Sequence, residues 1–260
     1  AAGNSGTPHI ARVKIDTTPP TSPPPTYSPH PGDNGWYTST VSVELTAVDA
    51  TSGVSATYYQ VDAGAFQLGS QFDVAPDGVR TIGYYAEDHA CNREPLQTAT
   101  LKVDKTCPGT SYQLEGLQGE GGWFVASPVR LTLTAGDVVT GVQTSGVSVV
   151  CYRLDGDSWQ QRSGSTVSLL FETSSGNEEI HTVEYFALDL AGNAEPIRTV
   201  TFGIDRRAPR AITYLPVVTP SDWTNMNSFD IHWDENPDDL SGIGGVYYGF
   251  AEPSSPTDGT

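Results

Sequence analysis

Basic side chains are scarce in this chain of 260 residues. It has 13 Lys and Arg against 31 Asp and Glu, which gives a formal net charge of −18. A surface of this sign repels the phosphates of nucleic acids and of anionic lipids, so neither is an expected partner. No apolar run approaches the ~20 residues that a membrane-spanning helix needs, so we do not expect direct membrane insertion.

Sequence motifs of catalysis are also missing. The chain has no Gly-x-Ser-x-Gly, no His-Glu-x-x-His and no glycine loop followed by Lys that would bind a phosphate. Its 5 histidines are scattered along the chain and do not indicate one site. The acidic residues recur in register with the repeat described next, whereas a catalytic acid–base pair should occur once. We therefore expect no enzymatic activity.

The sequence does contain a phrase that occurs three times with constant spacing. In each copy an Ala-x-Asn triplet precedes an Asp by 12 residues, in the pairs Asn4–Asp16, Asn92–Asp104 and Asn193–Asp205. Each Asp opens a segment that contains proline, and a Trp follows it by 20, 19 and 18 residues at Trp36, Trp123 and Trp223. A fixed period of this kind indicates a tandem array of similar domains.

The spacing also predicts the domain boundaries. The opening Asp residues lie 88 and then 101 residues apart, which predicts domain 1 over 17–104, with a Pro-rich start at 17–31, and domain 2 over 105–205. Residues 1–16 match only the closing strand of a preceding unit, and 206–260 match only the first half of a third. We expect a window cut from a longer array. The alternative is a complete protomer whose unpaired strand and half-domain pair with neighbouring copies.

Apolar and polar residues alternate along several short segments. Val41-Ser-Val-Glu-Leu-Thr-Ala and Val129-Arg-Leu-Thr-Leu-Thr-Ala each place their apolar side chains on one face, as in a strand of an antiparallel sheet. No long stretch has a helical period, and 27 Gly with 19 Pro suit many short strands joined by turns. About seven strands in roughly 90 residues predict an all-β fold of tandem immunoglobulin-like β-sandwiches in an elongated array.

Asp and Asn side chains fall on three loops that gather at one end of such a sandwich: the start of the unit, the loop after its second strand and the loop before its last strand. They are Asp16, Asp49, Asp88 and Asn92 in the first unit, Asp104, Asp137, Asp189 and Asn193 in the second, and Asp205 at the start of the third. Converging side-chain oxygens are what Ca²⁺ binds, whereas no Cys/His pair at ligand spacing favours Zn²⁺. The alternative is turn chemistry, in which these side chains bond to nearby backbone N–H groups.

The 3 cysteines allow at most one disulfide within the chain. We place Cys107 at the start of the second unit and Cys151 at the beginning of its third strand, so both are expected near the same end of the domain. The prediction is a Cys107–Cys151 disulfide with Cys91 unpaired or bonded to another chain. Three unpaired thiols are the alternative.

The repeated tryptophans have two interpretations. Exposed Trp36, Trp123 and Trp223 would form stacking platforms for the rings of a polysaccharide. However, each occupies the same step before the second strand of its unit, which is typical of an aromatic residue that packs in a core or junction.

Several segments carry a resemblance to a known group of domains. Asn34-Gly-Trp-Tyr-Thr-Ser, Leu45-Thr-Ala-Val-Asp-Ala-Thr-Ser-Gly-Val and Asp189-Leu-Ala-Gly-Asn resemble the bacterial Ig-like tandem repeats of large secreted and cell-surface proteins. The third unit resembles a fibronectin-like sister subtype. The chain departs from the pattern at Cys91, where the repeats have Gly, and at Cys107, where they usually have Ala.

The resemblance implies an extracellular or cell-surface location and leaves two functions open. The first is a non-catalytic structural segment of a bacterial stalk, fibre or sheath that polymerises, with neighbouring Ig-like domains of the same or identical chains as its partners. The second is an accessory carbohydrate-binding or spacer module of a secreted glycoside hydrolase, or an adhesin, that contacts cell-surface polysaccharide. Neither requires a cofactor, apart from the candidate Ca²⁺. Fold alone does not decide between them.

Overall fold

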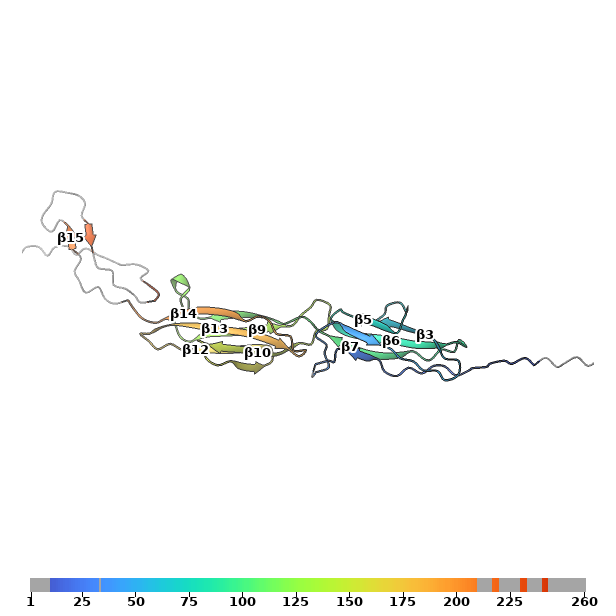
Figure 1. Ribbon diagram of the computed structural model, residues 1–260. Coiled ribbons are helices and arrows are strands. Elements are labelled where there is room, and N and C mark those ends of the chain that lie inside the picture. The colour runs from blue at the N-terminus through green and yellow to red at the C-terminus, as the bar shows by residue number, and fades with distance from the viewer. Residues whose placement is uncertain (1–9, 33, 210–216, 220–229, 233–239, 243–260) are drawn as a thin grey trace, which may run out of the picture.

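The computed structural model describes residues 10–32, 34–209, 217–219, 230–232 and 240–242. Two β-sandwiches lie end to end along one line (Figure 1). The all-β fold class predicted from the sequence is confirmed: apart from the 3₁₀ turn η1 (Glu120–Gly122), the described residues form only strands, turns and loops. The described residues contain no helix with the length and hydrophobicity that crossing a membrane requires.

The first sandwich has seven strands in two antiparallel sheets. The sheets have the orders β1-β2-β5 and β4-β3-β6-β7. Their bounds are β1 (Thr26–Ser28), β2 (Val41–Glu44), β3 (Val54–Val61), β4 (Gln67–Leu68), β5 (Gln71–Val74), β6 (Gly78–Asp88) and β7 (Gln97–Val103).

The second sandwich repeats this topology strand for strand. Its sheets have the orders β12-β9-β8 and β11-β10-β13-β14. Their bounds are β8 (Gly109–Glu115), β9 (Val129–Gly136), β10 (Val147–Leu154), β11 (Gln160–Ser163), β12 (Thr166–Phe171), β13 (Glu178–Asp189) and β14 (Arg198–Asp205). In the third unit, β15 (Val217–Thr219) pairs with β16 (Asp230–His232).

Each sandwich has a hydrophobic core of its own, made by the alternating residues of its inner faces. Val41, Val43 and Leu45 are buried in the first core, and Val129, Leu131 and Leu133 in the second. The two cores share no residue. Each fully buried aliphatic side chain contributes about 1.5–3 kcal/mol to the stability of its own domain. Residues 10–16 lead into the first sandwich without forming a strand, and Val13 and Ile15 are exposed.

The predicted Cys107–Cys151 disulfide is wrong, because all three cysteines are free thiols. Cys151 is buried in the middle of β10, where it pairs with Phe186 of β13. Cys107 is exposed and precedes β8, a strand of the opposite sheet. The prediction failed because it started the third strand at Cys151, whereas β10 begins at Val147. Burial raises the pKa of the Cys151 thiol, which makes it a poor nucleophile.

In each of the two described sandwiches, the Trp precedes an aromatic residue that pairs with the last strand. Tyr37 N donates to Lys102 O and Asp104 N donates to Tyr37 O, at 2.9 and 2.8 Å. Phe124 makes the same two bonds with Gly203 and Asp205. In domain 2 the Trp123 ring lies against the bare backbone of Gly203 in the last strand, and in domain 1 the Lys102 ammonium of the last strand lies over the Trp36 ring. The backbone bonds of Tyr37 and Phe124 form a short parallel bridge with the last strand, and this bridge anchors the strand that leads into the next unit.

Gly203→Ala tests this packing. A Cβ atom at Gly203 would overlap the Trp123 ring, so the ring or the strand must shift. We expect domain 2 to lose about 1–3 kcal/mol of unfolding free energy, as in other overpacked sites. Gly136→Ala is the matched control, since it also adds a methyl group to a strand glycine but meets nothing within 4 Å. Urea unfolding should separate the two variants; equal stability would contradict a packed Trp123.

Candidate functional site: two carboxylate clusters

Three aspartates converge at the N-terminal end of domain 1. Asp16 precedes the Pro-rich segment, Asp49 follows β2 and Asp88 ends β6. One carboxylate oxygen from each lies within 4.8 Å of the others. Asp88 is buried, whereas Asp16 and Asp49 are half-buried.

Domain 2 repeats this cluster at its junction with domain 1. Asp104 follows β7, Asp137 follows β9 and Asp189 ends β13. Their oxygens lie within the same 4.8 Å of one another, but here all three residues are buried, with exposures of 0, 8 and 3%. The structure therefore brings together the three predicted aspartates of the first unit and those of the second.

The two predicted asparagines lie beside the clusters and brace them. Asn92 Nδ2 donates to Asp88 Oδ2 at 2.8 Å and to the backbone oxygen of Asp16 at 3.1 Å. Asn193 makes the same pair of bonds to Asp189 and Asp104, at 2.7 and 3.0 Å. Both amides turn their N–H groups toward the aspartates, so they tie the loop before the last strand to the start of the domain rather than offer an oxygen ligand.

In the first cluster, backbone donors surround the carboxylate that follows β2. Asp49 Oδ1 accepts N–H bonds from Thr51, Ser52 and Gly53 at 3.2, 2.8 and 2.7 Å. Asp16 Oδ2 accepts a further bond from Ser52 N at 3.0 Å. This is the arrangement that the turn-chemistry alternative describes.

In the second cluster, the carboxylate that follows the second strand has fewer hydrogen-bond donors. Asp137 Oδ2 accepts one bond, from Gly146 N at 2.7 Å, while Asp137 Oδ1 is buried without a hydrogen-bond partner. Burial, followed by the nearby charges of Asp104 and Asp189, raises the pKa of Asp137. Asp88 of the first cluster differs: burial opposes its ionisation, but bonds from Asn92 and Ala90 outweigh this and lower its pKa.

Asp205 repeats the role of Asp16 and Asp104 at the start of the third unit. Its Oδ1 accepts the N–H of Arg207 at 2.7 Å and its Oδ2 accepts the Ser241 hydroxyl at 2.6 Å. The acidic residues 234–239 that would complete a third cluster lie outside the described residues. Each of the three aspartates thus binds the serine of a Ser-Gly turn, which is Ser52, Ser145 or Ser241.

Sequence reasoning missed a buried glutamate in each domain. Glu94 accepts N–H bonds from Ser22 and Ala86 at 3.0 and 2.8 Å. Glu195 accepts the matching bonds from Thr110 and Ala187 at 3.0 and 2.9 Å. Each carboxylate joins the first strand segment to the sheet opposite. The repeated phrases Asn92-Arg-Glu-Pro and Asn193-Ala-Glu-Pro were the available signal.

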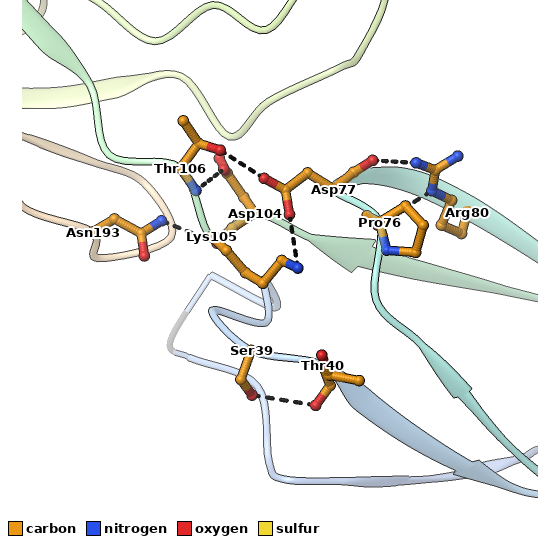
Figure 2. Close-up of polar contacts among 9 residues, drawn as sticks. All are labelled: Ser39, Thr40, Pro76, Asp77, Arg80, Asp104, Lys105, Thr106 and Asn193. Atoms are coloured by element: carbon orange, nitrogen blue, oxygen red, sulfur yellow. Dashed lines mark hydrogen bonds and ion pairs between the residues drawn. The ribbon is translucent and has the colours of Figure 1, made fainter.

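A second missed feature is an acidic side chain that holds the segment between the domains. Figure 2 shows the Asp77 carboxylate between the side chains of Lys105 and Thr106, next to Asp104. Asp77 Oδ2 accepts the Thr106 hydroxyl at 2.8 Å, and Lys105 Nζ lies 3.8 Å from Asp77 Oδ1. Asp77 immediately precedes β6, so it belongs to domain 1, while its two partners start domain 2.

Of the three repeat tryptophans, the two in the described residues, Trp36 and Trp123, are not fully exposed platforms. Trp36 is only 8% exposed, and Lys102 Nζ lies 5.9 Å from the centre of its ring. Trp123 is half-buried and lines a shallow hollow of about 260 Å³ with Ile180 and Phe202. Trp223 lies outside the described residues.

Comparisons with known proteins add little beyond this geometry. A scan against protein-family models and a search of curated proteins each found no match. Among solved structures, the chain is similar to the fibronectin(III)-like modules of Clostridium thermocellum CbhA, with 15% identity, a TM-score of 0.33 and coverage of 74% of this chain and 100% of that one. It is also similar to the D00-D0 domain of intimin, with 13% identity, a TM-score of 0.37 and coverage of 70% and 98%. Likenesses this distant do not bear on function, and the sandwich fold follows from the strand topology itself.

Asn193→Asp tests the bracing role. The change keeps the size of the side chain but replaces its donor group with a fourth carboxylate beside three buried ones. Without added divalent cations, we expect domain 2 to lose about 1.5–3 kcal/mol, the usual contribution of a hydrogen bond to a charged group, and more from repulsion. Asn177→Asp is the control, because it makes the same change in an exposed loop. Thermal unfolding in EDTA measures both; an unchanged midpoint for Asn193→Asp would show that the amide is dispensable.

Proposed function

We propose that this chain is a non-catalytic structural segment of an extracellular protein, in which Ig-like domains are held end to end as part of a stalk, fibre or sheath. The observation that carries the proposal is the set of bonds across the junction between the two sandwiches. A flexible linker would need no such bonds, whereas a rigid spacer depends on them.

Two separate parts of domain 1 contact domain 2. Asp77 holds Thr106 and Lys105, as described above. On the loop before Trp36, Asn34 Nδ2 donates to Leu190 O at 2.8 Å. Leu190 follows β13 directly, beside Asp189 of the second cluster. Because the two contacts lie on different loops, they oppose bending in more than one direction.

An acidic residue also contacts the following unit at the next junction, which supports the view that this contact belongs to the repeat. Glu178 occupies the position that Asp77 has in domain 1, at the start of the long strand before the last. Its Oε1 lies 3.2 Å from Arg207 Nη1, and its Oε2 accepts the N–H of Leu240 at 3.1 Å. In both cases an acidic residue of one unit binds a basic residue within the first two residues of the following unit, Lys105 or Arg207.

The charged groups also favour structure over catalysis. The three-aspartate clusters occupy the same positions in both domains, and most of their oxygens accept hydrogen bonds from neighbouring turns. A catalytic carboxylate pair would instead be unique and would face a substrate cleft. The alternative function, an accessory carbohydrate-binding module, has less support because Trp36 is buried.

Tryptic cleavage after Lys105 tests the rigid junction in the full chain. In the native protein Asp77 holds Lys105, so we expect slow cleavage. Asp77→Ala removes the ion pair and the Thr106 bond. A loss of about 1.4 kcal/mol from this contact would raise the population of the open junction, and hence the cleavage rate, about tenfold.

Asp73→Ala is the matched control, since it removes an exposed carboxylate of the same domain that has no contact with the junction. It should be cleaved as slowly as the native chain. Rapid cleavage after Lys105 in the native protein would contradict a rigid junction, as would equal rates in all three proteins.

A further inference from the structure

We propose that the second cluster, Asp104, Asp137 and Asp189, is a calcium site, whereas the matching first cluster is a hydrogen-bonded turn that does not depend on an ion. The inference deepens the proposed function, because an ion at this place would stiffen the junction. It is carried by a difference between two otherwise equivalent clusters.

The difference lies in the aspartate that follows the second strand of each domain. Asp49 is half-exposed and one of its oxygens receives three backbone N–H bonds. Asp137 is 8% exposed, receives one backbone N–H bond, and has a buried oxygen, Oδ1, without a partner. A buried carboxylate oxygen without a donor is costly to a fold unless something positive binds it.

The longer loop before Gly146 explains why Asp137 has fewer backbone donors than Asp49. Asp49 lies four residues before Gly53, whereas Asp137 lies nine residues before Gly146. In the short loop, every amide from 51 to 53 can reach the carboxylate. In the longer loop Val142 N bonds to Val139 O instead, and the Thr144 hydroxyl bonds to the backbone oxygen of Asp137. The longer loop therefore leaves the carboxylate with one unsatisfied oxygen.

The charge balance of the second cluster calls for a cation. Its three carboxylates are all buried, and within the described part of the chain no Lys, Arg or His forms an ion pair with any of them. Uncompensated buried charges of one sign destabilise a protein strongly. Four backbone N–H groups and the Asn193 side-chain amide reach Asp104 and Asp189, and they offset only part of this charge.

The ligand chemistry fits calcium. The cluster offers only carboxylate oxygens. It has none of the Cys or His ligands that Zn²⁺ sites use, so a zinc site is disfavoured. Ca²⁺ binds oxygens at about 2.3–2.6 Å, so two ligands of one ion lie at most about 5 Å apart, in agreement with the 4.8 Å limit of the cluster. Backbone carbonyls and water would complete the coordination, which in Ca²⁺ sites is adaptable in number and geometry.

The place of Asp104 connects the ion to the junction. Asp104 directly follows β7 of domain 1, and the next two residues are those that Asp77 holds (Figure 2). Asp137 and Asp189 belong to loops of domain 2. An ion bound by all three would therefore fix the end of domain 1 to two loops of domain 2, beside the contact between Asn34 and Leu190.

Calorimetry of the full chain in EDTA, in CaCl₂ and in MgCl₂ tests the inference. We expect Ca²⁺ to raise the unfolding midpoint of domain 2 by several degrees and Mg²⁺ to raise it much less. Hydrogen exchange should show that Ca²⁺ protects the amides of residues 137–146. No Ca²⁺-dependent shift, or an equal shift with Mg²⁺, would overturn the calcium site.

Two matched variants identify the site. Asp137→Asn removes one charge from the second cluster, and Asp49→Asn makes the same change in the first. We expect Asp137→Asn to be at least as stable as the native chain in EDTA, because repulsion falls, and to lose the Ca²⁺ shift. Asp49→Asn should keep that shift. Loss of the shift in both variants, or in Asp49→Asn alone, would contradict the assignment.

The test of the calcium site can fail without contradicting the proposed structural function. If Asp137→Asn fails to fold, the localised protection of 137–146 in the native chain still decides whether the second cluster binds Ca²⁺. Tryptic cleavage after Lys105 is measured in EDTA, so a rigid junction without a Ca²⁺ shift would remove the ion and leave the structural role in place.

Discussion

The structure depends on one aspartate at the start of each domain, which joins parts of the chain that are far apart in sequence. In domain 2, Asp104 binds the Ser145 turn with its carboxylate, while its backbone oxygen accepts the amide of Asn193. The N–H of the same residue bonds back to Tyr37 in domain 1. One residue therefore links the last strand of one domain to two loops of the next, and the constant spacing of 12 residues from Asn to Asp carries this link from unit to unit.

The period and the alternation predicted most of the fold. Val129, Leu131 and Leu133 had to face one core because the strand period is two, and the structure buries all three. The first residue of a strand was harder to predict, because the residues before Cys151 are apolar and fit either the end of a loop or a strand. That uncertainty of four residues gave the wrong disulfide.

The site was predictable in outline but not in its detail. Repeated loop positions indicated which aspartates converge, because the loops of a sandwich meet at its ends. Whether each oxygen has a donor depends on the path of the loop backbone, which spacing alone does not define. Glu94 and Glu195 escaped notice for a related reason: a single Glu in a polar loop looks solvated until the fold places backbone donors around it.

The two described sandwiches are joined by the contacts of Asp77 and Asn34, and we propose that they form one rigid unit. Residual dipolar couplings of the full chain in solution test this claim most directly. We predict that a single alignment tensor fits the amide couplings of residues 34–104 and 105–205 together. Two tensors of clearly different magnitude would show that the domains move independently and would contradict the account.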